Sequence, residues 1–375
     1  MKVLIDCFKL VKGEGKSIGI YNFSVNLVKN LVMHQKDNTN TMIRDSQIII
    51  IGNKFNRSDF EQTGVRFIEI RNYDPLNKFH CLIWELFAIS LICRKLDADR
   101  VIFPRGFCAI THPVKDIVII HDMIPFFYRE HYPDFFDKFE NAYIMCRLKF
   151  SARKCSKVIT ISEASKKEII KYCGISQSKI EVIYNGCNEV KACPKSCQEY
   201  EGKYICAVTS YLPHKNAKGI FEAYKRYCNT TENPLNLVVI GVEKPVGVSL
   251  PEDVLKRITC YKFIRDDNEF HSIIASAKAF VFLSYVEGFG FPPIEAMQLG
   301  IPVICSNVSS LPEIVDDAAI KVNPDDYDEI ARAIHNIICD GNLASELRER
   351  GIQNLKRFSW RENIRKYWDV LIKQY

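Results

Sequence analysis

Long apolar runs are missing from the chain, and so is an apolar leader at its amino terminus. The most apolar helix-like stretch, Phe79–Cys93, contains His80 and Glu85 and is shorter than the ~20 residues that a membrane span needs. The opening residues, MKVLIDCFKL, lack the h-region of a secretory signal peptide. We therefore expect a cytoplasmic protein without a membrane-spanning helix.

Cysteine pairs with metal-ligand spacing are also missing. The 15 cysteines are odd in number and scattered, and no C-x-x-C motif occurs among them. Cys193 and Cys197 come nearest to such a spacing, but no second pair follows them. We interpret the cysteines as reduced, buried thiols, and we predict no metal site.

A large excess of one charge is absent as well. The net charge is +6, with 47% hydrophobic and 26% charged residues, which is typical of a globular protein. No long basic stripe with interleaved aromatic residues is present, so we predict no nucleic-acid partner. The modest positive charge suits an acidic ligand or an anionic membrane surface.

One segment, from Arg147 to Lys171, does concentrate positive charge. Its basic residues are Arg147, Lys149, Arg153, Lys154, Lys157, Lys166, Lys167 and Lys171. Only Glu163 and Glu168 oppose them there. Such a cluster is either a solvated helix face or a surface that docks on anionic lipid, where each basic residue contributes about 1 kcal/mol.

Short strand patterns alternate with helical patterns along the whole chain, in two series. The first series has expected strands at Lys2–Cys7, Gln47–Ile51, Val65–Ile70, Arg100–Phe103, Ile117–His121, Lys157–Ile161 and Ile180–Ile183. The second has them at Tyr204–Val208, Leu237–Ile240, Ile258–Tyr261, Ala279–Leu283, Val303–Cys305 and Ile320–Val322. This alternation predicts parallel sheets covered on both faces. The fold class is therefore α/β, with two Rossmann-like domains.

The domain limits follow from a break between the two series. The polar segment Cys187–Gly202 has no clear period, so we place a first domain at 1–187 and a second at 203–358. Residues 359–375 form a further amphipathic helix that we expect to return to the first domain. Its apolar positions are Trp360, Ile364, Tyr367, Trp368 and Leu371.

The segment EGFGFPPIE carries the strongest signal for a ligand. It follows the expected strand Ala279–Ser284 and leads into an expected helix at Ile294–Leu299. Its two glycines let the backbone approach a ligand closely, and a helix amino terminus attracts anions. Taken singly, Glu287 is compatible with a solvated loop acid, and Glu295 with an acid that complements the helix dipole. The glycines and prolines between them favour a binding site.

This segment resembles the E-x7-E signature of the retaining glycosyltransferases of family 4. Further motifs of that family occur in its order: SIGIY (Ser17–Tyr21), HDMIP (His121–Pro125), VITISEASKKEI (Val158–Ile169), VIYNG (Val182–Gly186), LPHKN (Leu212–Asn216) and GIPVICSNVSSLPE (Gly300–Glu313). The resemblance covers nearly the whole chain. It implies GT-B architecture, in which two Rossmann-like domains face a central cleft.

The resemblance also implies how the second domain binds a nucleotide sugar. Glu295 would bind the ribose hydroxyls, because a carboxylate accepts hydrogen bonds from a vicinal diol. Glu287 would lie near the donor sugar. The backbone of Gly288, Phe289, Gly290 and Phe291 would touch the sugar and its phosphates.

The resemblance implies roles for four more residues, and each of them also has an ordinary structural interpretation. Lys215 would stabilise the leaving diphosphate in place of a metal, or it is a solvated loop lysine. His121 would lie near the reacting carbon, or it is a hydrogen-bonded structural histidine. Gly19, expected in the loop before the first helix, would offer its N–H to the donor phosphate, or it only forms a turn. Ile264 would contact the base, or it packs at a sheet edge.

The chain departs from the family where other members carry arginines. Ser210, His214 and Ile20 occupy those positions, so fewer fixed cations would meet the diphosphate. Arg265 or Arg105 would be the substitutes.

We therefore predict a retaining, metal-independent hexosyltransferase with no cofactor besides its nucleotide-sugar co-substrate. The segment HDMIPFFYREHYP resembles mannosyltransferases of bacterial surface-polysaccharide synthesis. This indicates GDP-mannose as donor, with a UDP-hexose as second choice, and a glycan or lipid-linked acceptor. The expected location is cytoplasmic, with peripheral association at the inner face of the membrane.

Other classes of protein remain as alternatives. A sugar-nucleotide epimerase or a non-catalytic nucleotide-sugar-binding protein can share this architecture. A metal-dependent transferase would use the D-x-D motif of Asp97 and Asp99, but this motif lies before strand Arg100–Phe103, so we interpret it as a solvated turn. The segment GEGKSIG lacks the G-x-G-x-x-G spacing of a nicotinamide oxidoreductase.

Overall fold

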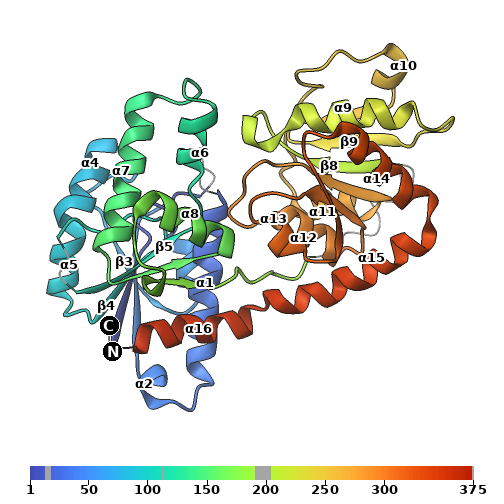
Figure 1. Ribbon diagram of the computed structural model, residues 1–375. Coiled ribbons are helices and arrows are strands. Elements are labelled where there is room, and N and C mark those ends of the chain that lie inside the picture. The colour runs from blue at the N-terminus through green and yellow to red at the C-terminus, as the bar shows by residue number, and fades with distance from the viewer. Residues whose placement is uncertain (13–17, 112–113, 191–203, 374–375) are drawn as a thin grey trace. The chain divides into compact units, whose positions relative to one another are not determined.

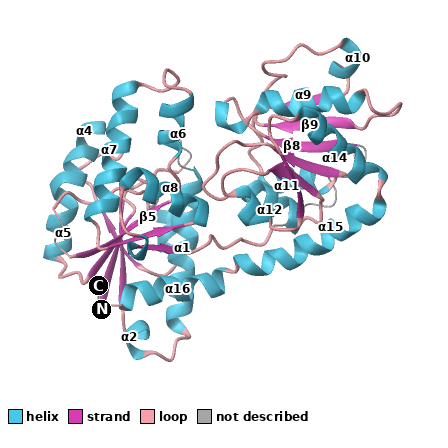
Figure 2. Ribbon diagram, viewed as in Figure 1, coloured by secondary structure: helices cyan, strands magenta, loops and turns pink. Residues whose placement is uncertain are grey.

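The computed structural model describes residues 1–12, 18–111, 114–190 and 204–373. The chain divides into two compact units. The first unit comprises Met1–Gly186 together with Ser359–Tyr375, and the second comprises Cys187–Phe358 (Figure 1). Each unit is an α/β structure built on one parallel sheet, as Figure 2 shows by secondary structure.

The first unit has a seven-stranded sheet in the order β3-β2-β1-β4-β5-β6-β7. Its strands are β1 (Lys2–Asp6), β2 (Gln47–Gly52), β3 (Arg66–Glu69), β4 (Arg100–Phe103), β5 (Lys115–Ile120), β6 (Lys157–Thr160) and β7 (Ile180–Val182). All neighbouring strands are parallel; Val3, for example, lies opposite Ile48 on one side and Arg100 on the other. The strand order reverses between β1 and β4, which makes their carboxyl ends the expected ligand position.

Helices cover both faces of this sheet. They are α1 (Ile18–Lys36), α2 (Thr41–Arg44), α3 (Arg57–Glu61), α4 (Lys78–Ile83), the π-helical turn η1 (Trp84–Ala88), α5 (Ile89–Lys95), α6 (Ile124–His131), α7 (Lys138–Lys154), α8 (Glu163–Cys173), the 3₁₀ turn η2 (Gln177–Lys179) and α16 (Trp360–Ile372). The helices α1 and α16 pack together on one face (Figure 1). Their apolar side chains join those of the sheet in one core. Trp360 fits against Gly186 so closely that a Cβ there would lie 2.2 Å from the indole ring.

The second unit has a six-stranded parallel sheet in the order β10-β9-β8-β11-β12-β13. The strands are β8 (Tyr204–Val208), β9 (Asn236–Ile240), β10 (Ile258–Tyr261), β11 (Ala279–Phe282), β12 (Val303–Ser306) and β13 (Ala319–Val322). The helices and 3₁₀ turns are η4 (Pro213–Lys215), α9 (Ala217–Cys228), α10 (Glu252–Leu255), α11 (Asp267–Ala275), α12 (Phe291–Gln298), α13 (Leu311–Val315), α14 (Tyr327–Cys339), α15 (Gly341–Asn354) and η5 (Leu355–Phe358). Here the order reverses between β8 and β11.

The structure confirms the predicted α/β class and places all the expected strands within two residues of their predicted ends. The helix limits differ more. The expected helix Phe79–Leu96 is interrupted by the π turn η1. The helix α12 begins at Phe291 instead of Ile294, because proline is tolerated in a first helical turn. None of the helices in the described ranges has the length and hydropathy of a membrane span.

Candidate functional site

The loop between β11 and α12 is shaped by glycine. Gly290 has φ of +104°, and a Cβ at this position would lie 2.6 Å from Leu311 Cδ2. Any other residue would be strained at this φ and would also push the Leu311 side chain aside. Because α12 begins at Phe291, Pro292 and Pro293 fall in its first turn and bring no N–H groups. The backbone donors that can face an anion are thus those of the loop, and the helix contributes fewer than the sequence suggested.

Lys215 and Glu287 meet at the reversal of strand order. Lys215 ends η4, which follows β8, and Glu287 follows β11. The Lys215 Nζ lies 2.5 Å from Glu287 Oε1, and it also lies 5.6 Å from the centroid of the Phe282 ring. The side chains are 24% and 11% exposed. The structure therefore brings two predicted site residues together, as an ion pair that the sequence analysis did not foresee.

Two serines fix the backbone at Glu287. The Glu287 N–H donates to Ser309 Oγ (3.1 Å), and the Ser309 hydroxyl donates to the Glu287 carbonyl (3.0 Å). The Ser310 hydroxyl contacts the carbonyl oxygens of Glu287 and Phe289, each at 3.0 Å. These serines belong to the motif GIPVICSNVSSLPE, yet their role was not predicted, because nothing local in the sequence connects them to a loop more than twenty residues away.

Glu295 is a largely buried acid. It lies in α12, and burial, reinforced by the charge of Asp267, raises the pKa of its carboxyl to about 7. Near neutral pH this carboxyl is therefore present in both protonation states. Each form can hydrogen-bond a hydroxyl, but only the ionised form accepts from both hydroxyls of a diol with full charge assistance.

His214, the residue before Lys215, does not supply the positive charge of the arginine that other members of the family carry there. His214 is 4% exposed, and burial, with the nearby charge of Lys215, lowers the pKa of its imidazole to about 4. It is neutral at physiological pH. Its carbonyl accepts from the Tyr285 N–H (2.8 Å), and the Thr209 hydroxyl donates to the Lys215 carbonyl (2.9 Å). These bonds tie η4 to the ends of β8 and β11.

Ile264 and Arg265 follow β10 at the same carboxyl edge of the sheet. Ile264 is half-buried and Arg265 is exposed. Because β9 separates β10 from β8, neither residue touches the Lys215–Glu287 pair among the interactions of the described residues.

In the first unit, His121 follows β5 and is neutral. Its Nε2 lies 2.9 Å from the Pro104 carbonyl, and because a carbonyl only accepts, this nitrogen carries the hydrogen. Burial lowers the pKa of the ring to about 4. The Phe23 ring meets the imidazole edge-on at 4.8 Å. His121 is thus hydrogen-bonded and uncharged, which suits a contact to a sugar but not proton donation at neutral pH.

Two predictions about the first unit need correction. Gly19 lies inside the first turn of α1 and not in a loop before it, and nothing lies within 4 Å of the place of its missing Cβ. The basic cluster is not one surface, since Arg147 and Lys157 are buried. Arg147 pairs with Glu85 at 3.3 Å, and Lys157 pairs with Glu181 at 3.6 Å. Arg147 lies among the buried positions of α7, and Lys157 is the first residue of the buried strand β6.

No group of three or more His, Cys, Asp or Glu side chains in the described part of the chain is arranged to hold a metal ion. Asp99 binds the Lys2 N–H at 2.7 Å, and Asp97 is almost fully exposed. Both therefore lie at the amino end of β4, away from the edge where His121 and Arg105 lie. Cys193 and Cys197 lie outside the described residues.

Comparisons with known proteins find two family models along the chain. Residues 43–190 match Glycosyltransferase Family 4, and residues 194–356 match Glycosyl transferases group 1. The O-antigen chain mannosyltransferase RfbU of Salmonella typhimurium is 30% identical over 304 residues, which cover 77% of this chain and 81% of RfbU. The O-antigen chain mannosyltransferase B of Escherichia coli is also 30% identical, over 66% of this chain and 67% of its own.

A solved structure shows the same fold over the whole length. HepE of Anabaena, crystallised with UDP-glucose, superposes with a TM-score of 0.69 at 18% identity, covering 99% of both chains. This likeness supports the GT-B architecture of two Rossmann-like units. The matched families and RfbU show that the chain belongs to the family 4 glycosyltransferases and is an enzyme of glycosyl transfer.

Proposed function

We propose that this enzyme transfers a hexose, with mannose as first choice, from a nucleotide sugar to a saccharide acceptor with retention of configuration. The Lys215–Glu287 pair carries the proposal, because it holds an ammonium group at the carboxyl edge of the sheet, beside a glycine-shaped loop. The names of RfbU and the E. coli relative favour mannose. GDP-mannose is therefore our first candidate donor and a UDP-hexose the second.

Lys215 acts on the leaving group. As the bond from the anomeric carbon to the phosphate oxygen breaks, negative charge builds on the diphosphate. An ammonium group held in a partly buried position stabilises that charge without waiting for solvent to reorganise. Glu287 fixes the ammonium before the donor binds, and the loop amides from Gly288 to Phe291 supply further donors. In this proposal the enzyme needs no metal ion for the step.

Retention follows from attack on the same face that the leaving group departs from. The acceptor oxygen bonds to the anomeric carbon, and its proton passes to the departing phosphate oxygen. No side chain then has to act as nucleophile, and the neutral imidazole of His121 would form a hydrogen bond to the sugar. Glu295 would hold the ribose through its hydroxyls, with the ionised form as the stronger acceptor.

The acceptor would be a glycan or lipid-linked saccharide at the cytoplasmic face of a membrane. The first unit exposes large apolar side chains on neighbouring helices: Phe79, Leu82, Phe87 and Leu91 on α4, η1 and α5, and Phe139 and Tyr143 on α7. Lys78 on α4 pairs with Glu140 on α7 at 3.4 Å, and the Tyr143 hydroxyl donates to Glu85 on η1. These contacts join the two groups into one apolar face, which we propose as a membrane-docking surface in addition to the exposed residues of the basic cluster.

The donor can be identified by thermal stabilisation in the presence of EDTA. A ligand that binds only the folded state raises the melting temperature by mass action. We expect GDP and GDP-mannose to raise the melting temperature by the same amount with and without EDTA. NMR of the product should show that the transferred sugar keeps the anomeric configuration of the donor. Stabilisation by no nucleotide sugar would disprove a transferase of this kind. An EDTA effect reversed by Mn²⁺ would disprove metal independence.

A further inference from the structure

Backbone strain in the second unit gathers around the Lys215–Glu287 pair. In the described part of the chain, four residues other than glycine have a positive φ: Asp97, Asn216, Ser309 and Asp316. Asn216 follows Lys215 directly, while Ser309 (φ of +58°) and Asp316 (φ of +52°) flank the helix α13. A positive φ is uncommon for a residue with a side chain. It persists where surrounding contacts enforce it, often at a functional site. The contacts that hold α13 are therefore expected to matter for the site.

The helix α13 transmits its position to the loop between β11 and α12. It has only five residues, too few to be stable without tertiary contacts, and it lies next to α12 (Figure 1). Directly before it, the hydroxyls of Ser309 and Ser310 hold the backbone of Glu287 and Phe289. A shift of α13 would therefore move the backbone groups of this loop.

The carboxyl end of α13 is held by side chains from the end of α15 and from η5. Arg357 donates to the Glu313 carbonyl (3.0 Å), and Asn354 donates to the Ile314 carbonyl (2.9 Å). The last carbonyls of a helix have no partner within the helix, so these bonds supply the missing donors. Arg357 also donates to the Asn354 side-chain oxygen (2.8 Å) and lies 3.4 Å from the Asp316 carboxylate. One guanidinium thus binds the helix, the strained residue after it and the neighbouring amide.

The turn that carries Arg357 also contacts the loop directly. The Phe358 ring meets the Phe289 ring edge-on at 5.3 Å, and both side chains are buried. The Asn354 amide lies 3.7 Å from the Met297 sulfur in α12. The end of α15 and η5 therefore contact α12, α13 and the loop between β11 and α12.

We infer that Arg357 is a positioning residue for the donor's diphosphate, and that it acts through α13 on the backbone of residues 287–291. The inference rests on the proposed function, in which the amides of this loop bind the diphosphate, and adds to it the residue that holds them in place. Arg357 fixes the end of α13, α13 fixes Ser309 and Ser310, and these hydroxyls fix the loop. A guanidinium suits this task because it donates in several fixed directions at once.

Amide hydrogen exchange of the full-length protein without ligand measures the positioning itself. In Arg357→Gln, the amides of residues 286–291 should exchange several-fold faster than in the wild type, because Ser309 then protects the Glu287 N–H less well. The strands of the second sheet should keep their exchange rates. Arg357→Lys should give an intermediate rate, since an ammonium does not reproduce the planar fork. Thermal melts show whether each variant folds, and Arg357→Lys carries the test if Arg357→Gln does not.

Calorimetry measures the consequence for binding, with GDP as probe or with UDP if UDP stabilises the wild type more. We expect Arg357→Gln to bind the nucleoside diphosphate about tenfold more weakly, an effect within the range for residues that act through others. Arg357→Lys should recover part of the affinity. Ser310→Ala should also weaken binding, and the double variant should bind no more weakly than the weaker single variant, because both changes act through the same contacts.

Arg350→Gln is the matched control. Arg350 lies on α15, and its side chain is 44% exposed, compared with 33% for Arg357. It pairs with Glu346 and Asp317, and among the contacts of the described residues it bonds no carbonyl of α13. This variant should keep the exchange rates of residues 286–291 and the nucleoside diphosphate affinity of the wild type.

Three results would overturn the inference. They are unchanged exchange at residues 286–291 in Arg357→Gln, additive effects of Arg357→Gln and Ser310→Ala on affinity, and equal losses in Arg357→Gln and Arg350→Gln. Faster exchange with unchanged affinity would leave Arg357 as the residue that positions the loop, but it would remove the diphosphate from the loop and so contradict the proposed function. Absence of nucleoside diphosphate binding by the wild type would count against the proposed function in the same way, while the exchange data would still decide the role of Arg357.

Discussion

Replacing Lys215 with alanine tests the proposed chemistry most directly. The change removes the ammonium that lies 2.5 Å from Glu287, and it leaves that carboxylate, 11% exposed, without its counter-charge. At an effective dielectric of 20, two unit charges 4 Å apart interact by about 4 kcal/mol. The charge on the diphosphate grows in the transition state, so most of this energy should appear in kcat.

We expect Lys215→Ala to lower kcat by about 10²–10³-fold, the range observed when one oxyanion donor is removed. Donor KM should also rise, because Glu287 then repels the diphosphate. Lys215→Arg should recover only part of kcat, since a planar guanidinium does not occupy the place of a compact ammonium. Lys218→Ala is the control: Lys218 is an exposed lysine three positions further along the chain, in α9.

The double variant Lys215→Ala/Glu287→Gln separates the two effects. Removing the unpaired carboxylate should lower donor KM again while kcat stays low, a non-additivity expected for residues in contact. Release of nucleoside diphosphate at saturating acceptor, or during donor hydrolysis, provides the assay. A kcat of Lys215→Ala within about threefold of the wild type would refute the reasoning and would make Arg265 the next cation to replace.

Three further predictions use other parts of the structure. Burial raises the pKa of Glu295 to about 7, so between about pH 4.5 and 7 the folded state holds a proton that the unfolded state releases, and stability falls as pH rises through this range. Glu295→Gln should therefore have the melting temperature of the wild type at pH 5 and a higher one at pH 8. Calorimetry should show that the affinity of the wild type for nucleoside diphosphate rises through pH 7, and that Glu295→Gln lacks this rise. Gly290→Ala should lower the melting temperature and abolish donor stabilisation, since its Cβ would lie 2.6 Å from Leu311, whereas Gly300→Ala, also at positive φ but in open space, should keep donor binding. Phe87→Ser/Leu91→Ser should weaken co-sedimentation with lipid vesicles and leave donor hydrolysis unchanged, with Ile352→Ser, on an exposed site of the second unit, as control; equal sedimentation of both variants would exclude the apolar face as the docking surface.

Most strands were predictable because they are short apolar runs between polar turns, such as β2 (QIIIIG) and β5 (KDIVII). A strand buried on both faces has no competing period, so its limits follow from composition. The pairing of Lys215 with Glu287 was not predictable in the same way. The two residues are 72 positions apart, and only the adjacency of β8 and β11 brings them together. The sequence predicted a separate role for each residue, and the order of the strands in the sheet brings the two together as an ion pair.

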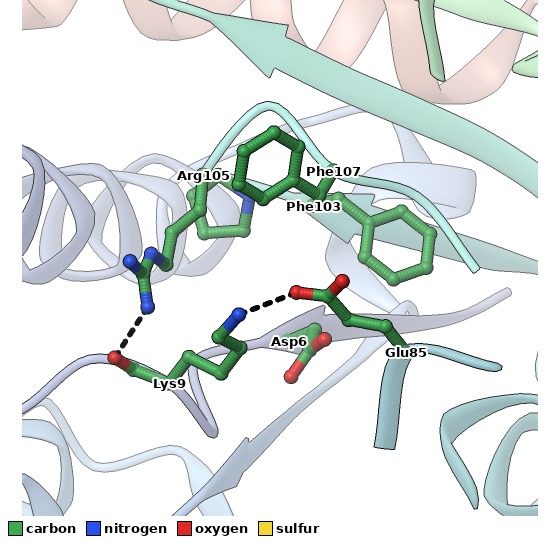
Figure 3. Close-up of a pocket in the computed structure, with 7 residues that line it drawn as sticks. Asp6, Lys9, Glu85, Phe103, Arg105 and Phe107 are labelled. Atoms are coloured by element: carbon green, nitrogen blue, oxygen red, sulfur yellow. Dashed lines mark hydrogen bonds and ion pairs between the residues drawn. The ribbon is translucent and has the colours of Figure 1, made fainter. Parts of the chain in front are cut away.

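The interpretation of the basic cluster as one exposed surface was wrong for Arg147 and Lys157, because charge was counted along the chain and not by the face that each residue occupies. Membrane docking of the other basic residues stays a prediction. In α7 the buried positions are Met145, Arg147, Leu148, Ser151 and Ala152. Arg147 is one turn from Ser151 and next to Leu148, so the helical period itself places it on the inner face. The same reasoning applied to Phe79–Cys93 shows a different limit: the π turn at Trp84–Ala88 shifts the period within the helix. That turn contains both Trp84, which donates to Asp6, and Glu85, which receives Lys9 (Figure 3) and Arg147. A regular helix there would point Trp84 and Glu85 in other directions. The π turn that interrupts the predicted helix therefore also determines that these two side chains reach Asp6, Lys9 and Arg147.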